Sequence, residues 1–168
     1  LDDAVIDRNF QNVLPRVNWD YDITNSKRLR FSYTTNVREP SLTQLQPIVD
    51  NSNPLSIYIG NPNLQPEYTH RLQLRYFSFS QFSMTNLFAL VNATYTDNAI
   101  VNSRTIDELF RQVTTPVNVQ NDYRLTSFAG FGTPMKFIRT RLNIHANYSF
   151  NRGRVFVNEL EEMTNRHV

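Results

Sequence analysis

The sequence contains no cysteine, only four glycines, and no long run of apolar residues. Without cysteine the chain has no disulfides, no thiolate nucleophile and no cysteine ligands for zinc. Four glycines leave no glycine-rich loop of the kind that cradles phosphates. The lack of any run of about 18 apolar residues excludes a transmembrane helix.

Clustered charge is also scarce. The 17 basic and 15 acidic residues nearly balance, for a net charge of +2. The basic residues form no patch, so nothing favours a nucleic-acid partner. The three histidines lie far apart without metal-ligand spacing, and the acidic pairs lie on solvated faces. We therefore expect no metal, no cofactor and no catalytic site, which means that the chain is not an enzyme.

The sequence does contain stretches in which apolar and polar residues alternate. The clearest of them is Phe137–Phe150. Apolar side chains such as Leu142 and Ile144 alternate there with polar ones such as Arg141 and His145. A β-strand points successive side chains to opposite faces, so this segment has one apolar and one polar face. It is also longer than the usual strand of about 5–6 residues. Both features are typical of a strand with lipid on one side and water on the other.

The same pattern recurs along the chain, and strands are predicted near 13–23, 28–36, 68–77, 83–96, 123–132 and 137–150. Short turns follow the first, third and fifth strands, whereas long connections, near 37–67 and 97–122, follow the second and fourth. Outer-membrane barrels have short periplasmic turns and long extracellular loops. The prediction is an all-β fold, an antiparallel meander of about six long strands in three hairpins.

Six strands cannot close a barrel, since the smallest has eight. We therefore expect an open, curved fragment of a larger transmembrane barrel, with residues 1–168 as part of a single domain. The acidic start at Leu1 has neither the basic nor the apolar region of a signal peptide, which favours a fragment over a complete precursor. A soluble β-sandwich also alternates apolar and polar residues and is the main alternative fold.

Three motifs point to a family. They are Val13-Leu14-Pro15, then Arg38-Glu39-Pro40-Ser41, and finally Gly60-Asn61-Pro62-Asn63-Leu64-Gln65-Pro66-Glu67. In this order they resemble the C-terminal barrel of TonB-dependent outer-membrane receptors, within the outer-membrane β-barrel proteins. Gln65 stands where the family often has lysine. Proline fixes its own φ and favours an extended residue before it, so we expect the motif to shape the entry to a strand. Arg38 and Glu67 are expected to pair across the open end of the hairpin.

The resemblance implies the outer membrane of a Gram-negative bacterium and a barrel of 22 strands around an N-terminal plug. No plug is recognisable in this chain. The intact protein would import a scarce nutrient, such as an iron chelate, a vitamin, a glycan or a peptide, with energy supplied through TonB. Its partners would be membrane lipid, the plug, TonB and possibly a surface lipoprotein. A passive outer-membrane barrel or a surface-adhesion protein is one alternative, and a soluble sandwich that binds carbohydrate is another.

Two sets of residues are candidates for binding. Arginines that alternate onto the polar strand faces are expected to face the barrel lumen, where they pair with carboxylates or attract an anionic substrate. These are Arg16, Arg28, Arg30, Arg71, Arg75, Arg139 and Arg141. The long extracellular connections are the candidate substrate lid, and their candidate contacts are Arg38, Tyr58, Asn61, Asn63 and Phe110.

Overall fold

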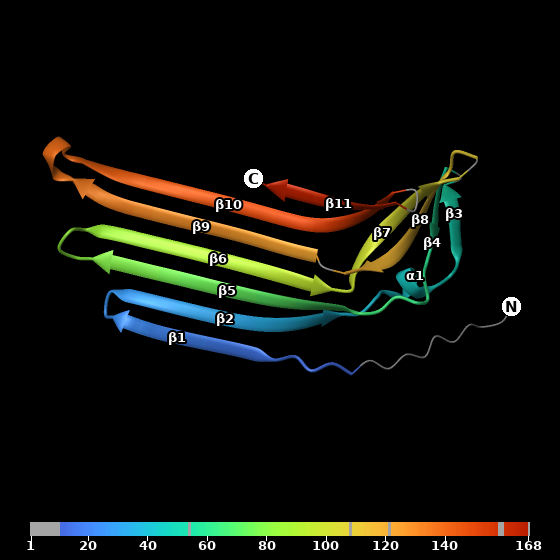
Figure 1. Ribbon diagram of the computed structural model, residues 1–168, viewed down its shortest axis with the longest axis horizontal. Helices are drawn as coiled ribbons and strands as arrows, with labels where there is room; N and C mark the ends of the chain where they lie inside the picture. Colours follow the sequence, from blue (N-terminus) through green and yellow to red (C-terminus); the bar gives the residue numbers. More distant parts are fainter. Residues whose placement is uncertain (1–10, 54, 108, 121, 158–159, 168) are drawn as a thin grey trace.

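The computed structural model describes residues 11–53, 55–107, 109–120, 122–157 and 160–167. The wall consists of six long strands, which lie side by side in Figure 1. They are β1 (Arg16–Thr24), β2 (Lys27–Arg38), β5 (Glu67–Ser80), β6 (Thr85–Asp97), β9 (Asp122–Met135) and β10 (Thr140–Val157). Each pairs antiparallel with the next, in the order β1-β2-β5-β6-β9-β10. The short turns all lie at one rim of this wall.

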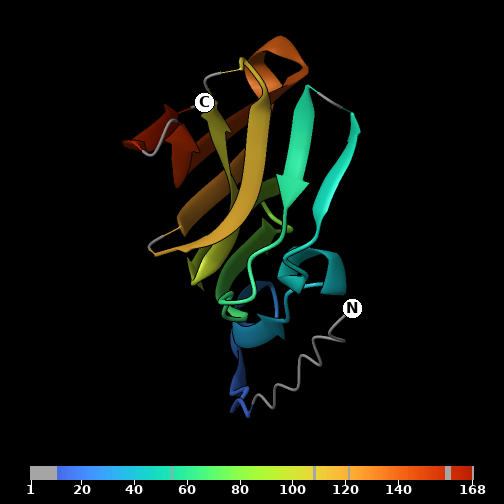
Figure 2. The same ribbon diagram turned by 90° about the vertical axis from the view of Figure 1, so that its right-hand side faces the viewer.

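The opposite rim has further secondary structure, which we call the extension. It consists of α1 (Leu42–Leu45), β3 (Val49–Asn53), β4 (Ser56–Ile59), β7 (Ala99–Ile106) and β8 (Gln112–Val119). The sheet order continues from β10 through β7, β8 and β4 to β3. In Figure 2 the β3–β4 and β7–β8 hairpins stand next to each other, joined by parallel pairing of β4 with β8. The long connections are thus folded, not irregular.

The all-β antiparallel meander is confirmed, and the sheet does not close on itself. Several details differ from the prediction. The described residues form eleven strands, because the two long connections contain four and β11 (Leu160–His167) pairs with β10. No helix in the described part of the chain is long and apolar enough to span a membrane.

The last turn lies later than predicted. β9 continues through Gly132 to Met135, and the chain reverses in the 3-10 turn η1 (Lys136–Ile138). Arg139 follows in the left-handed region, with φ of 50°. The expectation that Arg139 lies on the polar face of a strand from Phe137 to Phe150 is therefore wrong for this residue, since the strand begins at Thr140. Alternation of residue types does not reveal a left-handed turn.

The pairing register of the six wall strands places their apolar residues on the same face of the sheet. Leu142 pairs with Thr133, and Ile144 with Phe131, which in turn pairs with Leu87. Residues directly opposite one another point to the same side of a sheet, so each strand contributes its apolar residues to one shared face. This apolar face carries Trp19, Tyr21, Leu29, Phe31, Leu72, Leu74, Leu87, Val91, Leu125, Phe131, Leu142, Ile144 and Tyr148.

The apolar face is exposed, which decides between barrel wall and sandwich. A sandwich would bury this face against a second sheet. Instead Leu74, Leu142 and Ile144 are 37%, 39% and 52% exposed, and the described strands all belong to one sheet. An exposed apolar face this broad requires an apolar medium, because soluble proteins rarely expose large contiguous apolar patches. The arrangement is that of a membrane barrel wall and not of a soluble sandwich.

Candidate functional site

The wall and the extension are connected by a set of contacts that we call the joint. It consists of the contacts made by Arg38, Ser41, Gln44, Gly60, Asn61, Glu67 and Asn118. The first of these contacts lie at the short helix α1. Its N-cap Ser41 accepts a hydrogen bond from the backbone N–H of Gln44, while the Gln44 side chain accepts one from the N–H of Ser41 at 2.9 Å. This reciprocal capping box satisfies donors that a helix N-terminus leaves free. The Gln44 carbonyl then accepts the N–H of Asn61 at 2.6 Å. The segment after Arg38-Glu39-Pro40 is thereby fixed to the start of the Gly60–Glu67 motif.

Gly60 is required by close packing at this contact. It is buried, and a Cβ atom there would overlap the carbonyl of Gln46 and lie 2.9 Å from the carbonyl oxygen of Thr43. Both neighbours are backbone atoms, which cannot rotate away as a side chain does.

We predict that Gly60→Ala displaces α1 from the motif and lowers the free energy of unfolding by about 1–3 kcal/mol, the usual cost of overpacking. Limited proteolysis on intact cells should then cut the extension of the variant faster than that of the wild type. The matched control is Asn63→Ala, at an exposed position of the same motif. Equal cleavage rates for wild type and Gly60→Ala would contradict the prediction.

The middle of the motif binds β8. The Asn61 side chain donates to the carbonyl of Pro116 at 3.1 Å and accepts from the N–H of Asn63 at 2.9 Å. Asn118 accepts from the N–H of Gln65 at 2.7 Å, and its Nδ2 donates to the Gln65 carbonyl at 2.9 Å and to that of Asn98 at 2.7 Å. Leu64 is fully buried. The motif therefore ties the two long connections together.

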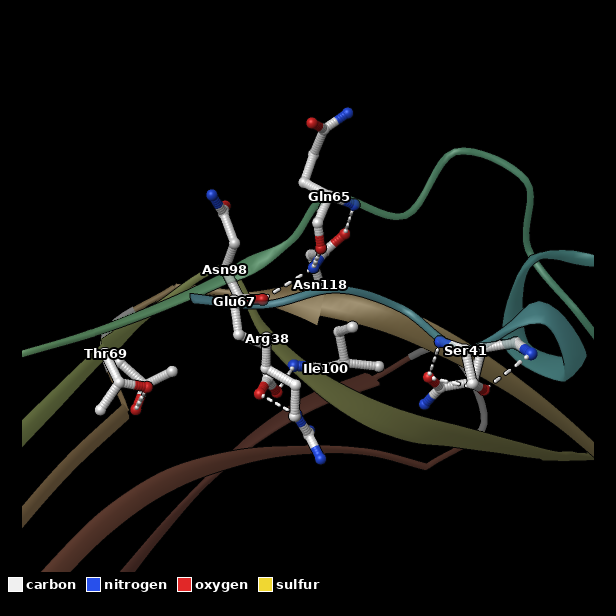
Figure 3. A network of polar contacts seen from close by, with 10 residues as sticks. Arg38, Ser41, Gln65, Glu67, Thr69, Asn98, Ile100 and Asn118 are labelled. Carbon is white, nitrogen blue, oxygen red and sulfur yellow. Dashed lines mark hydrogen bonds and ion pairs between the residues drawn. The ribbon is translucent and has the colours of Figure 1, made fainter. Parts of the chain in front are cut away.

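Glu67 completes the joint at the start of β5 (Figure 3). Its carboxylate accepts from Arg38 Nε and from the backbone N–H of Ile100, each at 2.6 Å. The Glu67 side chain is 11% exposed and the Arg38 side chain 64% exposed. The pair expected from the sequence is thus present, and it also reaches β7. One buried carboxylate connects β2, β5 and β7.

The remaining loop candidates do not converge with Arg38. Tyr58 lies half-buried in β4, where burial raises the pKa of its hydroxyl. Asn63 is exposed in the turn before Leu64. Phe110 lies between β7 and β8, 86% exposed, with a φ of 57°. The proposed roles of these residues in substrate binding stay predictions.

Phe110 lies at the tip of the β7–β8 hairpin, and this tip is held by an ion pair between Asp107 and Arg111. Asp107 accepts the backbone N–H of Arg111 at 2.9 Å and its Nε at 2.7 Å. These hydrogen bonds, the backbone one first, lower the pKa of Asp107 below its ordinary value. A lowered pKa in the folded state means that this contact is fully present above the ordinary aspartate pKa and is lost as the pH falls through the lowered value. The tip therefore keeps its shape at neutral pH.

The polar face of the wall carries the other predicted arginines. Arg28 pairs with Asp22 at 2.9 Å and Arg30 with Asp20 at 3.1 Å, both across the β1–β2 hairpin and both exposed. Arg141 donates to the side-chain carbonyl of Asn86 at 2.9 Å. Arg16, Arg71 and Arg75 lie on the same face by register. Exposed pairs stabilise by at most about 1 kcal/mol each, so these two pairs contribute little to the stability of the wall.

The polar face is not uniformly polar. Phe77 and Phe88 lie opposite each other, and the rings of Phe88 and Phe128 are 5.7 Å apart. Together with Arg28, Arg30 and Arg75, the first two line a hollow of about 200 Å³. The sequence contains these aromatic residues, but only the strand register reveals that they lie next to one another. Sequence reasoning also does not identify Asn98 and Asn118 as part of the site, because their partners lie in a distant segment.

Comparison with known proteins agrees with this architecture. A model of the outer membrane protein beta-barrel family matches residues 2–167. No curated protein matches the chain. Since the family match spans nearly the whole sequence and the fold is an unclosed wall with one apolar face, the chain belongs to the outer membrane protein beta-barrel family and resides in the outer membrane of a Gram-negative bacterium.

Proposed function

We propose that this chain is part of the barrel wall of a TonB-dependent receptor that imports a scarce nutrient. The observation that carries the proposal is the joint itself. The motif by which the sequence resembles these receptors fastens a folded extension to one rim of the wall, through Gly60, Asn118 and Glu67. A receptor needs such a structure over its lumen, because binding sites are commonly carried on loops positioned by a rigid scaffold.

The wall contributes a polar surface to the transport path. Arg16, Arg71, Arg75 and Arg141 lie on the polar face along with the two arginine–aspartate pairs. Arginine pairs with carboxylates and phosphates through its planar fork of donors. These groups support passage of an anionic nutrient or contact with an acidic surface of the plug.

The test uses the intact gene in its own bacterium. Wild-type, gene-deleted and TonB-deleted strains are grown with iron, a vitamin, a glycan or a peptide as the single scarce nutrient, and uptake is measured with a labelled form. We expect one nutrient for which uptake is lost in both deletions, and an N-terminal plug encoded upstream.

Other outcomes would contradict the proposal. Uptake that needs the gene but persists without TonB would identify a passive barrel. Normal uptake of every nutrient, combined with loss of attachment to a surface, would identify an adhesion protein. Restoring the gene on a plasmid controls for effects of the deletion on neighbouring genes.

A further inference from the structure

A hollow of about 510 Å³ lies midway along the wall strands, on the polar face. The side chains of this face that line it are Leu90 and Asn92 of β6, Thr126 and Phe128 of β9, and Asn147 and Ser149 of β10. Ser127 and Tyr148 also line it, but their side chains point to the apolar face, so they contribute backbone to its floor. Its volume lies within the range of about 300–1,000 Å³ that is usual for small-molecule sites.

The strand register arranges these side chains in two rows. Leu90, Phe128 and Asn147 lie opposite one another in the first row, and Asn92, Thr126 and Ser149 in the second, which is nearer the extension. The second row continues through Gln73, Ser32 and Asn18 to β1 and contains no charged residue. The rows on either side contain arginines, among them Arg71 and Arg75. The middle of the polar face is therefore a neutral band of amides and hydroxyls.

The aromatic ring of the hollow is held by two neighbouring rings. The ring centroid of Phe128 is 5.7 Å from that of Phe88 and 5.9 Å from that of His145, and the His145 ring stacks on it at an angle of 17°. Phe88 and Arg75 both line the smaller hollow of about 200 Å³. The Phe88–Phe128 pair therefore separates a neutral hollow from one lined by arginines.

The polar side chains of β10 in the hollow are available to a ligand. Among the residues that the structure describes, none forms a hydrogen bond with the side chain of Asn147 or Ser149. Asn92 accepts a hydrogen bond from Gln73 Nε2 at 2.8 Å, and its Nδ2 is 3.4 Å from the hydroxyl of Thr126. An amide offers two donors and an acceptor, and a hydroxyl offers one donor and an acceptor. The hollow thus presents groups of both kinds beside one fixed ring.

This combination matches the chemistry of a sugar ring. A pyranose has C–H groups on its faces and hydroxyls around its edge. The C–H groups pack against the negative face of an aromatic ring, and the hydroxyls both donate to and accept from amides and hydroxyls. A charged ligand would lack a partner, because no charged side chain lines the hollow and an unpaired charge is costly to desolvate. Iron chelates and small peptides carry charged groups, whereas a neutral saccharide carries none.

We propose that this hollow binds one unit of a neutral saccharide, with the sugar ring on Phe128 and its hydroxyls bonded to Asn147 and Ser149. The proposal rests on the proposed import function and narrows the nutrient to a neutral glycan. The arginines in the rows on either side are then left for contact with an acidic surface of the plug.

The test measures binding of neutral disaccharides of glucose, galactose and mannose to the full-length protein in detergent by isothermal titration calorimetry. We expect at least one of them to bind. Asn147→Ala and Phe128→Ala should each weaken that binding about tenfold, the effect of one lost contact with the ligand. The corresponding uronic acid disaccharide, in which carboxylates replace the C6 hydroxymethyl groups, should bind more weakly, since the hollow offers no cation.

The matched control is Asn143→Ala, which removes an amide from the same face of β10 outside the hollow. It should bind the disaccharide as the wild type does, and so should Arg75→Ala. Lack of binding by every neutral disaccharide, unchanged binding by both hollow variants, or preference for the uronic acid form would overturn the proposal. So would a tenfold loss in Arg75→Ala, which would place the ligand in the arginine-lined hollow. Heat-modifiable migration in gels verifies that each variant is a folded barrel.

The binding measurement requires neither TonB nor transport, so its result can be told apart from that of the uptake test. Saccharide binding by a protein whose uptake does not need TonB would support the hollow and contradict the import proposal. TonB-dependent uptake of another nutrient, with no saccharide bound, would contradict the hollow and support import.

Discussion

Val91→Arg is expected to lower the free energy of unfolding of the barrel in lipid by about 2–4 kcal/mol, the cost of arginine near the midplane of a barrel's lipid face. Val91 lies midway along β6 and is opposite Leu74 on one side and Ser127 on the other, within the apolar face. Denaturant unfolding of the full-length protein in vesicles would measure the change.

The adjacent residue provides the control. Leu90 is equally apolar but points to the polar face, where it lies opposite Arg75 and Phe128. Leu90→Arg should therefore cost much less than Val91→Arg, because its guanidinium reaches water. A similar loss for both variants, or a larger loss for Leu90→Arg, would mean that the apolar face does not meet lipid.

Glu67→Ala should be the most damaging single truncation in the joint, lowering the free energy of unfolding by roughly 3 kcal/mol, since hydrogen bonds to charged groups contribute about 1.5–3 kcal/mol each. The substitution removes the acceptor for Arg38 Nε and for the Ile100 N–H together. Hydrogen exchange should show faster opening of β7, because the Ile100 N–H loses its partner.

Two further single substitutions separate the two hydrogen bonds of Glu67. Arg38→Ala removes only the arginine contact and leaves the Ile100 bond in place, so β7 should stay protected from exchange. Glu67→Gln keeps an acceptor of the same shape and should fall between wild type and Glu67→Ala. If Arg38→Ala and Glu67→Ala loosen β7 equally, the bond to Ile100 has no role in holding the extension.

The wall could be predicted because each of its strands can be recognised from its own residues alone. Alternation with a period of two identifies each strand and assigns its side chains to faces, as in β2, where Leu29, Phe31 and Tyr33 alternate with Arg28, Arg30 and Ser32. Short turns then fix the pairing within each of the three hairpins. The pairing of Arg38 with Glu67 also followed, since Arg38 ends one wall strand and Glu67 begins the next.

The extension was not predictable in the same way. β7 and β8 are rich in β-branched residues, such as Val101, Val113 and Val117, which favour strands. That composition favours strands, but β8 is covered along its whole length and therefore shows no clear alternation of apolar and polar residues. The partners of Asn118 and Gly60 lie in other segments, at Gln65 and Gln46, and no local pattern encodes such contacts. Phe128 and Asn147 likewise come together in one hollow only through the register of β9 and β10.

The joint has a consequence for how such a protein can diversify. Glu67, Gly60 and Asn118 hold the base of the extension to the wall, whereas Leu109 and Phe110 at its tip are 68% and 86% exposed. Exposed tips tolerate substitution and insertion far better than packed bases do. Substitutions can therefore accumulate at the tip while the base stays constant. Two related proteins should differ in sequence most around Phe110 and least around Gly60.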